Sequence, residues 1–377
     1  MTYARPASEI PMIAYLVHDL NDAAVARRVE GFSAGGAQVI VAGFYRREAV
    51  ETVSGAPAIT LGQTHDARLG QRALLVAKAM VFRNALVKAI ADCTIIVARN
   101  LEMLTLARSI AKKHQTIVYE LLDIHRTLLG TGLLSTFVRN VEKKALRSTA
   151  ATIVSSDAYR HKYLKAVQRH HGPVILVENK VSRGDAGANS PAKAQLQAPW
   201  RIGWFGMLRC RRSLDLLCEA AARSNGRIEV VLAGIPSLTE FEDFYGQVEH
   251  AEGVKFAGSY STDELPELYS SVNFAWCIDF FEEGLNSAWL LPNRLYEALS
   301  HAVIPVALVG TQTGHWLGRA GVGLCLSVAE DIAGVMNSMD GSKLATLRKQ
   351  ISRLDPGTYA FSQSDHESLV RQLAAAG

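Results

Sequence analysis

The sequence predicts an α/β protein with two doubly wound domains, and three observations support that prediction. The chain has 377 residues, enough for two domains of ordinary size. Short, uninterrupted apolar runs alternate with helix-periodic segments in both halves, as in parallel sheets covered on both faces. A stretch rich in Gly, Ala, Ser, Pro and Gln separates the halves. We therefore predict an N-terminal domain over 1–180, a linker over 181–199, a second domain over 200–358 and a C-terminal segment, 359–377, whose helix is able to pack back on the first domain.

In the first half, the continuous apolar runs predict buried strands and the 3.6-residue periodicity predicts helices. Strands are expected at 12–17, 39–44, 94–98, 116–121, 151–154 and 174–177. Helices are expected at 23–34, 68–91, 137–147 and 157–168, with a further helix ending at 113. The first of these helices ends at Gly35-Gly36, a typical C-cap signal.

The second half repeats the alternation. Strands are expected at 200–205, 228–233, 254–257, 272–278 and 303–308, and helices at 213–223, 293–301, 330–339, 342–354 and 365–375. In open parallel sheets, ligands bind beyond the carboxyl ends of the strands. The cleft between the two domains is therefore the expected site.

The cysteines and the N-terminus indicate a cytosolic protein. The five cysteines have no CxxC spacing, which favours reduced thiols over a disulfide framework or a zinc site. The first apolar run, 10–17, is too short for a secretory signal with its cleavage site or for a membrane span, so it is interpreted as a strand.

The charge of the chain is distributed unevenly. Residues 1–180 hold 24 Lys and Arg against 14 Asp and Glu, whereas the remainder is acidic. A basic half predicts an anionic partner. No recognition-helix, RRM or zinc-finger pattern supports nucleic acid, so we favour an anionic membrane surface, with the cationic helix 68–91 as the contacting element. An ordinary solvated surface and a plain packing helix are the alternatives.

The stretch 279–308 predicts a loop, a helix and a buried strand that together bind a nucleotide. The loop carries Asn286 and Ser287, and Asn293 follows a proline at a position suited to capping the helix start. Backbone N–H groups at a helix start bind anions. Glu297 lies one turn further on, where a carboxylate can accept hydrogen bonds from the diol of a ribose. A buried structural glutamate is the alternative.

A second loop, 206–213, is expected to hold phosphate. Gly206 ends a predicted strand, and Arg209 and Arg212 precede the next helix. Glycine permits close backbone approach, and the planar guanidinium suits phosphate oxygens. The alternative is a set of surface arginines. The absence of GxGxxG and GxxxxGK[ST] motifs argues against a dinucleotide oxidoreductase or a P-loop enzyme.

Taken together, these stretches resemble the GT-B glycosyltransferases, and the resemblance covers nearly the whole chain. The similar segments are LPNRLYEALSHAVIPVA, FGMLRCRRSLDLL, IEVVLAG, VKFAGSYSTDELPELYSSVNFAW and, in the first half, RRVEGFSAGGAQVIVAGF. The chain is similar to bacterial exopolysaccharide transferases of the succinoglycan and xanthan type and to the family-four-like donor domain. The resemblance implies two Rossmann-like domains facing a cleft, and a nucleotide sugar bound by Gly206, Arg209, Arg212, Tyr260, Asn286, Ser287, Asn293, Arg294 and Glu297.

The chain departs from the family pattern at two places. Met207 stands where the family has arginine, so Arg209 is expected to substitute, and Arg212 stands where the family has lysine. Trp289 stands eight residues before Glu297, where retaining members have a first glutamate. Its absence favours an inverting mechanism.

Inversion needs a base for the acceptor hydroxyl. The resemblance implies Asp123, at the end of a first-half strand, with His125 as the alternative base. His18 and Asp19, with Arg27, are expected to bind the acceptor, and the His18-Asp19 pair is a further candidate base. The alternatives are a helix cap for Asp123, a supporting role for His125 and loop capping for His18 and Asp19.

The expected function is transfer of a hexose, with glucose favoured, from a UDP-sugar to a lipid-linked oligosaccharide in exopolysaccharide biosynthesis. No cofactor or metal is expected, because no DxD motif or spaced His cluster occurs. The expected location is cytoplasmic and peripheral to the inner membrane. A UDP-sugar 2-epimerase-like enzyme and a non-catalytic GT-B-like binding subunit are the alternatives.

Overall fold

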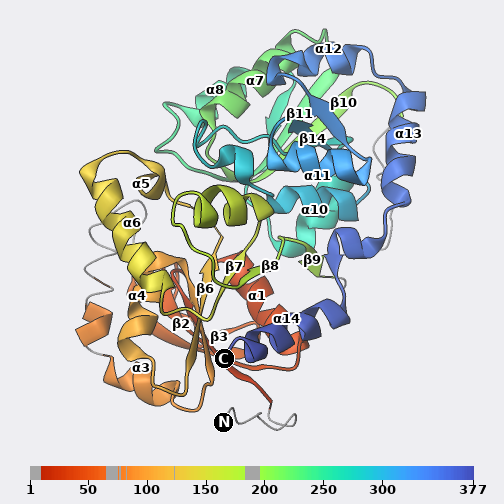
Figure 1. The fold of residues 1–377 in the computed structure, drawn as a ribbon. Coiled ribbons are helices and arrows are strands. Elements are labelled where there is room, and N and C mark those ends of the chain that lie inside the picture. The colour runs from red at the N-terminus through yellow and green to blue at the C-terminus, as the bar shows by residue number, and fades with distance from the viewer. Residues whose placement is uncertain (1–9, 65–74, 76–77, 82, 123, 183–195) are drawn as a thin grey trace. The chain divides into compact units, whose positions relative to one another are not determined.

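The computed structural model describes residues 10–64, 75, 78–81, 83–122, 124–182 and 196–377. The chain divides into two compact units, the first formed by Met1–Val177 with Ser362–Gly377 and the second by Glu178–Phe361 (Figure 1). The division falls between 177 and 178, whereas the sequence places the first boundary at 180. Among the described residues, no helix is long and apolar enough to span a membrane.

The first unit contains an eight-stranded sheet in the order β3-β4-β2-β1-β5-β6-β7-β8. The strands are β1 Met12–Val17, β2 Gln38–Tyr45, β3 Thr52–Val53, β4 Ala56–Gln63, β5 Ile95–Arg99, β6 Thr116–Leu121, β7 Ala151–Val154 and β8 Val174–Leu176. All neighbours pair in parallel except β3 and β4. The six predicted strands are present. The sequence prediction missed β3 and β4, which are only partly buried and therefore lack a continuous apolar run.

The helices of the first unit are α1 Ala23–Ala34, α3 Asn84–Ala89, α4 Asn100–Ile110, α5 Arg126–Leu129, α6 Leu133–Leu146 and α14 Gln363–Ala375, with a π-helix at Tyr159–Lys165. The helix predicted at 157–168 is therefore present but shorter, and it is a π-helix. Of the predicted helix 68–91, residues 75, 78–81 and 84–89 are helical, while 68–74, 76, 77 and 82 lie outside the described residues.

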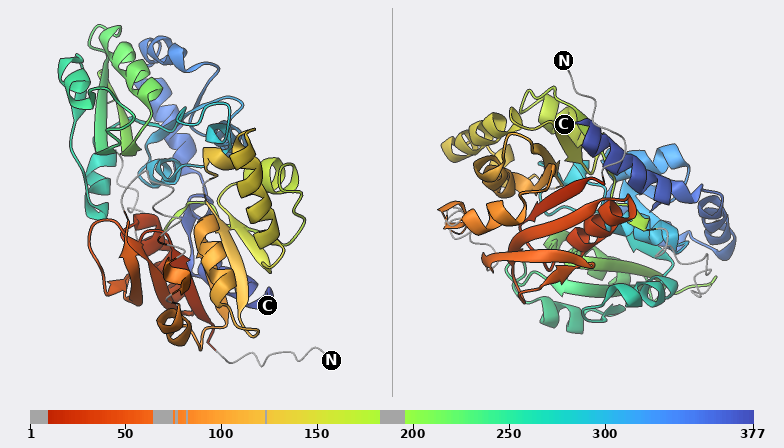
Figure 2. Two further views of the ribbon diagram at one scale, coloured as in Figure 1. Left: turned by 90° about the vertical axis from the view of Figure 1, so that its left-hand side faces the viewer. Right: turned by 90° about the horizontal axis from the view of Figure 1, so that it is seen from below.

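The C-terminal helix α14 packs against α1 in the first unit (Figures 1 and 2). Glycine at the C-cap of α1 permits this approach, because a Cβ at Gly35 would lie 2.4 Å from the carbonyl oxygen of His366. Gln363 Nε2 donates a hydrogen bond of 2.6 Å to the carbonyl of Ala34. The C-terminal helix α14 is thus part of the first unit.

The second unit contains a six-stranded parallel sheet in the order β12-β11-β10-β13-β14-β15. The strands are β10 Trp200–Leu208, β11 Ile228–Pro236, β12 Val254–Phe256, β13 Phe274–Trp276, β14 Ile304–Leu308 and β15 Leu324–Leu326. A separate pair joins β9 Val181–Ser182 to β16 Ala360–Phe361. The predicted linker therefore contains a short strand. The strand predicted at 272–278 is shorter in the structure, where β13 covers Phe274–Trp276.

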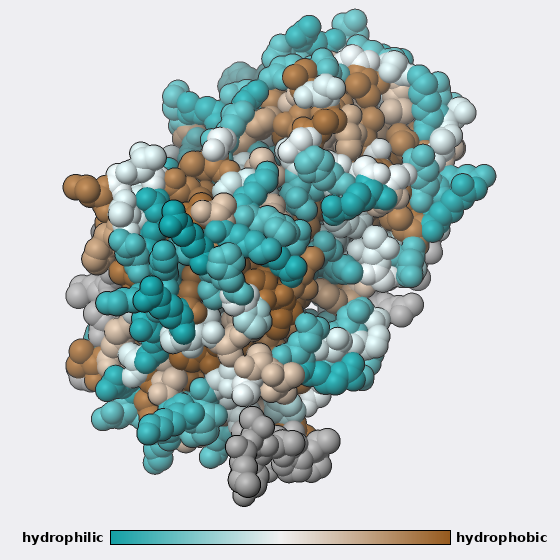
Figure 3. Space-filling model, viewed as in Figure 1, coloured by the Kyte–Doolittle hydropathy of each residue, from teal (hydrophilic) through white to brown (hydrophobic). Residues whose placement is uncertain are grey.

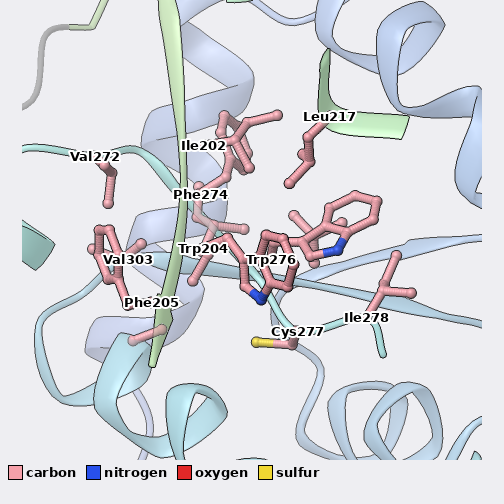
Figure 4. Close-up of a cluster of buried hydrophobic side chains, with 14 of the residues drawn as sticks. Ile202, Trp204, Phe205, Leu217, Val272, Phe274, Trp276, Cys277, Ile278 and Val303 are labelled. Carbon is pink, nitrogen blue, oxygen red and sulfur yellow. The ribbon is translucent and has the colours of Figure 1, made fainter. Parts of the chain in front are cut away.

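The helices of the second unit are α7 Arg211–Ala222, α8 Phe244–His250, α9 Leu265–Ser270, α10 Asn293–Ser300, α11 Gln312–Ala320, α12 Ile332–Asn337 and α13 Gly341–Ser352. The sequence prediction missed α8, α9 and α11. Large aromatic side chains fill the core along β10 and β13, including Trp204, Phe274 and Trp276 (Figure 4). This core fixes the strand ends that carry the candidate donor site.

Candidate functional site

Three neighbouring strands of the second unit, β10, β11 and β12, each have a glycine at or soon after the carboxyl end. Gly206 in β10 and Gly234 in β11 have φ values of 109° and 129°, which favour glycine. A Cβ at Gly234 would lie 1.9 Å from the carbonyl oxygen of Gly206. Gly234 N also donates a 2.8 Å hydrogen bond to the carbonyl of Gly258, after β12. Glycine backbone without side chains therefore lines the carboxyl ends of these three strands.

Tyr260 follows the third of these strands and lies beside Gly206. A Cβ built at Gly206 would be 4.0 Å from the Tyr260 hydroxyl. The structure therefore brings together two predicted donor-site residues that lie far apart along the chain.

The loop before α10 is held by its own side chains. Ser287 Oγ accepts a 2.8 Å hydrogen bond from Glu282 N, and Asp279 Oδ1 accepts one of 2.8 Å from Phe281 N. Asn286 is buried in this loop. The geometry thus gives Ser287 a structural contact at the position where the sequence suggests donor binding.

Helix α10 begins differently from the sequence prediction. Pro292 is the N-cap, in extended conformation, and Asn293 is the first helical residue, so the predicted Asn293 cap is wrong. The preceding backbone is fixed by Asn179 Nδ2, which donates to Leu291 O at 2.9 Å. Thr313 Oγ1 donates to Leu290 O at 3.0 Å. The helix therefore starts from a well-anchored turn.

Glu297 lies one turn into α10 and is buried. Tyr269, from α9, donates a hydrogen bond of 3.1 Å to Glu297 Oε2. Burial raises the pKa of Tyr269, and the charge of Glu297 raises it further. The ring of His301 stacks on Tyr269 with 5.1 Å between centroids. Packing and hydrogen bonding therefore fix the orientation of the carboxylate before any ligand binds.

The two predicted phosphate-binding arginines have different surroundings. Arg209 stacks over Phe281 at 4.5 Å, and its Nη2 lies 4.0 Å from Asp279 Oδ2, a long ion pair. Its side chain is 34% exposed and is therefore accessible to a ligand.

Arg212, by contrast, is paired with two acids. Its Nη1 donates to both carboxylate oxygens of Glu283, at 2.5 and 2.7 Å, and its Nη2 donates to Glu330 at 3.1 Å. These hydrogen bonds raise the pKa of Arg212. A diphosphate would have to compete with two carboxylates for this guanidinium. Arg294 also has a protein partner, since its Nη1 lies 3.4 Å from the Trp276 carbonyl.

In the first unit, the loop after β1 is closely tied to its surroundings. Asp19 Oδ1 accepts a 3.1 Å hydrogen bond from Asn21 N, and Asp19 Oδ2 lies 3.2 Å from Arg46 Nε. Burial raises the pKa of Asp19. His18 Nδ1 lies 3.4 Å from Asn100 Nδ2, at the start of α4. His18 and Asp19 therefore both have structural contacts in the first unit.

Arg27 contributes to the same loop region through its charge. Asp22 caps α1 by accepting from Ala24 N at 2.9 Å. Burial alone would raise the pKa of Asp22, but the charges of Arg99, His18 and Arg27 outweigh it, and the pKa is lowered. Positive charges therefore stabilise the Asp22 carboxylate at the beginning of α1.

Beneath this loop lies a buried ionic network that the sequence analysis missed. Arg28 Nε donates to Glu120 Oε1 at 2.7 Å, and Tyr15 donates to the other oxygen of the same carboxylate. Arg99 Nη1 donates to the Tyr15 hydroxyl at 3.2 Å, and Arg99 Nη2 lies 4.0 Å from Asp22 Oδ2. One feature of the sequence indicates this network. A charged residue stands at or near the end of each of two otherwise apolar strands, β5 and β6.

Of the two candidate bases, the described residues include only His125. Asp123 lies outside the described residues. His125 is the N-cap of α5, and its Nδ1 accepts a 3.2 Å hydrogen bond from Thr127 N. Since Nδ1 accepts, the neutral ring carries its proton on Nε2 and presents a donor there. His125 therefore has a structural contact at the start of α5, and its role as a base stays a prediction.

Among the residues that the structure describes, no group of three or more His, Cys, Asp or Glu side chains is arranged to hold a metal ion. The candidate donor site of the second unit combines glycine backbone, the start of α10, Arg209 and the buried Glu297. That combination can bind a ribose and a diphosphate.

Comparison with known proteins places these features in context. No protein-family model matches the chain. The succinoglycan biosynthesis protein ExoL of Rhizobium meliloti (strain 1021) is 43% identical over 374 residues, covering 96% of this chain and 93% of that protein.

Solved structures with the same architecture share little sequence with the chain. Sucrose-phosphate synthase from Thermosynechococcus elongatus superposes with a TM-score of 0.74 at 16% identity, covering 97% of this chain and 100% of that one. Anabaena HepE in complex with UDP and glucose gives a TM-score of 0.69 at 15% identity, with the same coverage. WaaG, a glycosyltransferase of lipopolysaccharide biosynthesis, gives 0.57 at 12% identity, covering 95% of each chain. These comparisons confirm the predicted GT-B fold.

Proposed function

We propose that the chain, which belongs to the family of the succinoglycan biosynthesis protein ExoL and has the GT-B fold, is a glycosyltransferase that moves a hexose from a UDP-sugar to a lipid-linked oligosaccharide. Glucose is the first candidate for the hexose. The acceptor belongs to the assembly of an exopolysaccharide, as the name of the ExoL relative indicates for that protein.

The observation that carries the proposal is the buried carboxylate of Glu297, one turn inside α10 and held by Tyr269 at 3.1 Å. Ribose hydroxyls are donors that could approach a carboxylate in this position. HepE, which shares the fold, was solved in complex with UDP and glucose, and this supports UDP as the nucleotide.

The donor's diphosphate is proposed to lie at the start of α10 and beside Arg209. Backbone N–H groups at the helix start and the arginine charge would stabilise the negative charge that grows on the leaving UDP. Arg209 is the better candidate than Arg212, because two carboxylates already hold Arg212. Tyr260 and Gly206 are proposed to border the base, and Asn286, Ser287, Asn293 and Arg294 to shape the remainder of the pocket.

The transfer is proposed to proceed with inversion and without a metal. The bond between the sugar's anomeric carbon and the phosphate oxygen breaks, and the acceptor oxygen forms the new bond on the opposite face. The acceptor's proton passes to Asp123, which the family resemblance favours as the base, while His18, Asp19 and Arg27 bind the acceptor. Trp289, in place of the glutamate of retaining members, supports inversion.

The decisive experiment measures UDP release from a panel of UDP- and GDP-sugars with a lipid-extract acceptor. The wild type is expected to release UDP only when acceptor is present, and Glu297→Ala to lose both turnover and UDP binding. Glu219→Ala is the matched control, since Glu219 is an exposed glutamate of α7 that pairs with Arg223. Failure to bind any nucleotide sugar would contradict the proposal.

Further measurements separate the finer claims. Asp123→Asn is expected to abolish turnover while retaining UDP binding. Turnover in excess EDTA tests metal independence, and the anomeric configuration of the product by NMR tests inversion. An acceptor-independent change of the sugar at C2 would indicate the epimerase alternative, and UDP binding without turnover for any acceptor would indicate a binding subunit.

A further inference from the structure

The first turn of α6 exposes three large apolar side chains. Leu133, Leu134 and Phe137 are 92%, 65% and 65% exposed, and we call these three residues the apolar tip. Single exposed apolar side chains are ordinary, but a cluster within one helical turn marks an interaction surface.

The apolar tip does not pack into the core of the first unit, because the opposite side of α6 is the one that faces this core. Ala145 and Leu146 are buried there, and so is Glu142, which accepts a 2.7 Å hydrogen bond from Tyr119 and further bonds from Tyr163 and Gln168. Leu133 and Phe137 are four residues apart and so lie on the same side of the helix. Helix packing within the unit therefore directs the tip outward.

The turn that precedes α6 is also fixed. Arg139 Nη1 donates to the carbonyls of Leu128 and Gly130 at 3.0 and 2.5 Å. This guanidinium ties the end of α5 to the second turn of α6. The apolar tip is thus presented by a braced helix hairpin, so little ordering would be needed when a partner binds.

Basic side chains continue along the exposed side of α6. Helical spacing places Lys144 and Arg147 on the same side as Leu133 and Phe137, with Lys143 next to them. Residues 124–156 contain five Lys and Arg but one acidic residue, the buried Glu142. In Figure 3, brown atoms lie at the left edge, where Figure 1 draws the beginning of α6, and dark teal atoms lie beside them. This surface is apolar at one end and positively charged beyond it.

We infer that this surface of α6 docks on an anionic lipid bilayer, with the apolar tip entering the acyl boundary and the basic side chains contacting headgroups. Apolar side chains beside Lys and Arg on one helix are typical of elements that lie in a membrane interface. The inference rests on the proposed lipid-linked acceptor, which such docking would bring within reach. It assigns the contact to α6 rather than to the helix expected at 68–91.

The test is flotation of the full chain with vesicles of phosphatidylcholine alone and of phosphatidylcholine with 30% phosphatidylglycerol. The wild type is expected to bind the anionic vesicles. Leu133→Ser with Phe137→Ser should lower the partition coefficient at least tenfold at both low and high salt. Lys143→Gln with Lys144→Gln should lower it several-fold at low salt, where charge attraction is least screened.

Two matched controls are available. Leu238→Ser removes an apolar side chain of the second unit that is 57% exposed. Lys112→Gln with Lys113→Gln removes an exposed adjacent lysine pair from the first unit. Both controls are expected to bind vesicles as the wild type does.

Several results would overturn the inference. These are wild-type protein that does not float with anionic vesicles, or equal loss of binding in the tip variant and its control. A third is a tip variant that changes the sedimentation mass but not vesicle binding, which would make the surface a contact between copies of the chain. UDP binding is measured on the same samples, so failure of the docking inference is distinguishable from failure of the proposed function.

Discussion

The phenol of Tyr269 donates a hydrogen bond of 3.1 Å to the carboxylate of Glu297, and both side chains are buried. This contact joins α9 to α10 and holds the carboxylate that we propose binds the ribose. The two residues are therefore expected to respond differently to substitution, because one contacts the donor and the other positions that contact.

Tyr269→Phe is expected to raise KM for the UDP-sugar about three- to tenfold, which corresponds to the loss of one hydrogen bond of ordinary strength. Glu297→Ala should lower kcat/KM by about a hundredfold or more, since charge-assisted bonds to the donor are lost as well. Steady-state kinetics of UDP release measures both. Tyr245→Phe, at an exposed tyrosine, is the control. Equal effects of the Tyr269 and Glu297 changes would refute the division of roles.

Glu120→Ala is expected to destabilise the first unit by about 3–5 kcal/mol, because it leaves Arg28 and Arg99 buried without their shared carboxylate. The matched control is Glu219→Ala, which breaks an exposed pair with Arg223 of 2.9 Å. An exposed pair contributes about 0–1 kcal/mol. Urea unfolding followed by circular dichroism compares the two variants, and a similar loss in both would show that burial of the network is unimportant.

The packing of α14 on α1 is expected to weaken in acid. Burial lowers the pKa of His366 from 6.5, and the nearby Arg28 lowers it further while Asp365 opposes the shift. The folded state therefore binds protons less readily than the unfolded chain. The stabilisation is complete above pH 6.5 and is lost as the pH falls below that value through the folded pKa.

Thermal unfolding between pH 7.5 and 5.5 measures this effect. His366→Gln should reduce the pH-dependent drop in Tm relative to the wild type. The exposed His250→Gln change in the second unit is expected to leave that drop unaltered. If His366→Gln and the wild type lose the same Tm, the histidine is not responsible.

Gly234→Ala is expected to destabilise the second unit by about 2 kcal/mol or more, through left-handed backbone strain and overlap with β10. The added Cβ would lie 1.9 Å from the Gly206 carbonyl oxygen. Gly334→Ala, in α12, is the control, since no atom lies within 4 Å of its added Cβ. That change should stabilise the protein by up to about 1 kcal/mol. Chemical denaturation measures the free energy of unfolding of both variants. Equal stability of the two variants would contradict the close approach of β10 and β11.

The apolar strands of both sheets were predictable from sequence because burial on both faces requires continuous runs of apolar residues. Strand β4 was not, because nearly all of its positions are exposed or only partly buried near the sheet edge and so carry no continuous apolar run. The position of Glu297 inside a helix was predictable from local spacing. The cap of that helix was not, since Pro292 takes the extended N-cap conformation and displaces Asn293 into the first turn.

The sequence by itself determined the α/β alternation, the glycine positions at the strand ends and the place of Glu297 one turn into α10, because each depends on residues close together in the chain. The tertiary structure decided which charges meet. Arg212 pairs with Glu283 and Glu330, and Glu120 with Arg28, across 71, 118 and 92 positions of sequence. No local pattern specifies such partners, because a side chain's electrostatic environment is set by which distant segments fold against it.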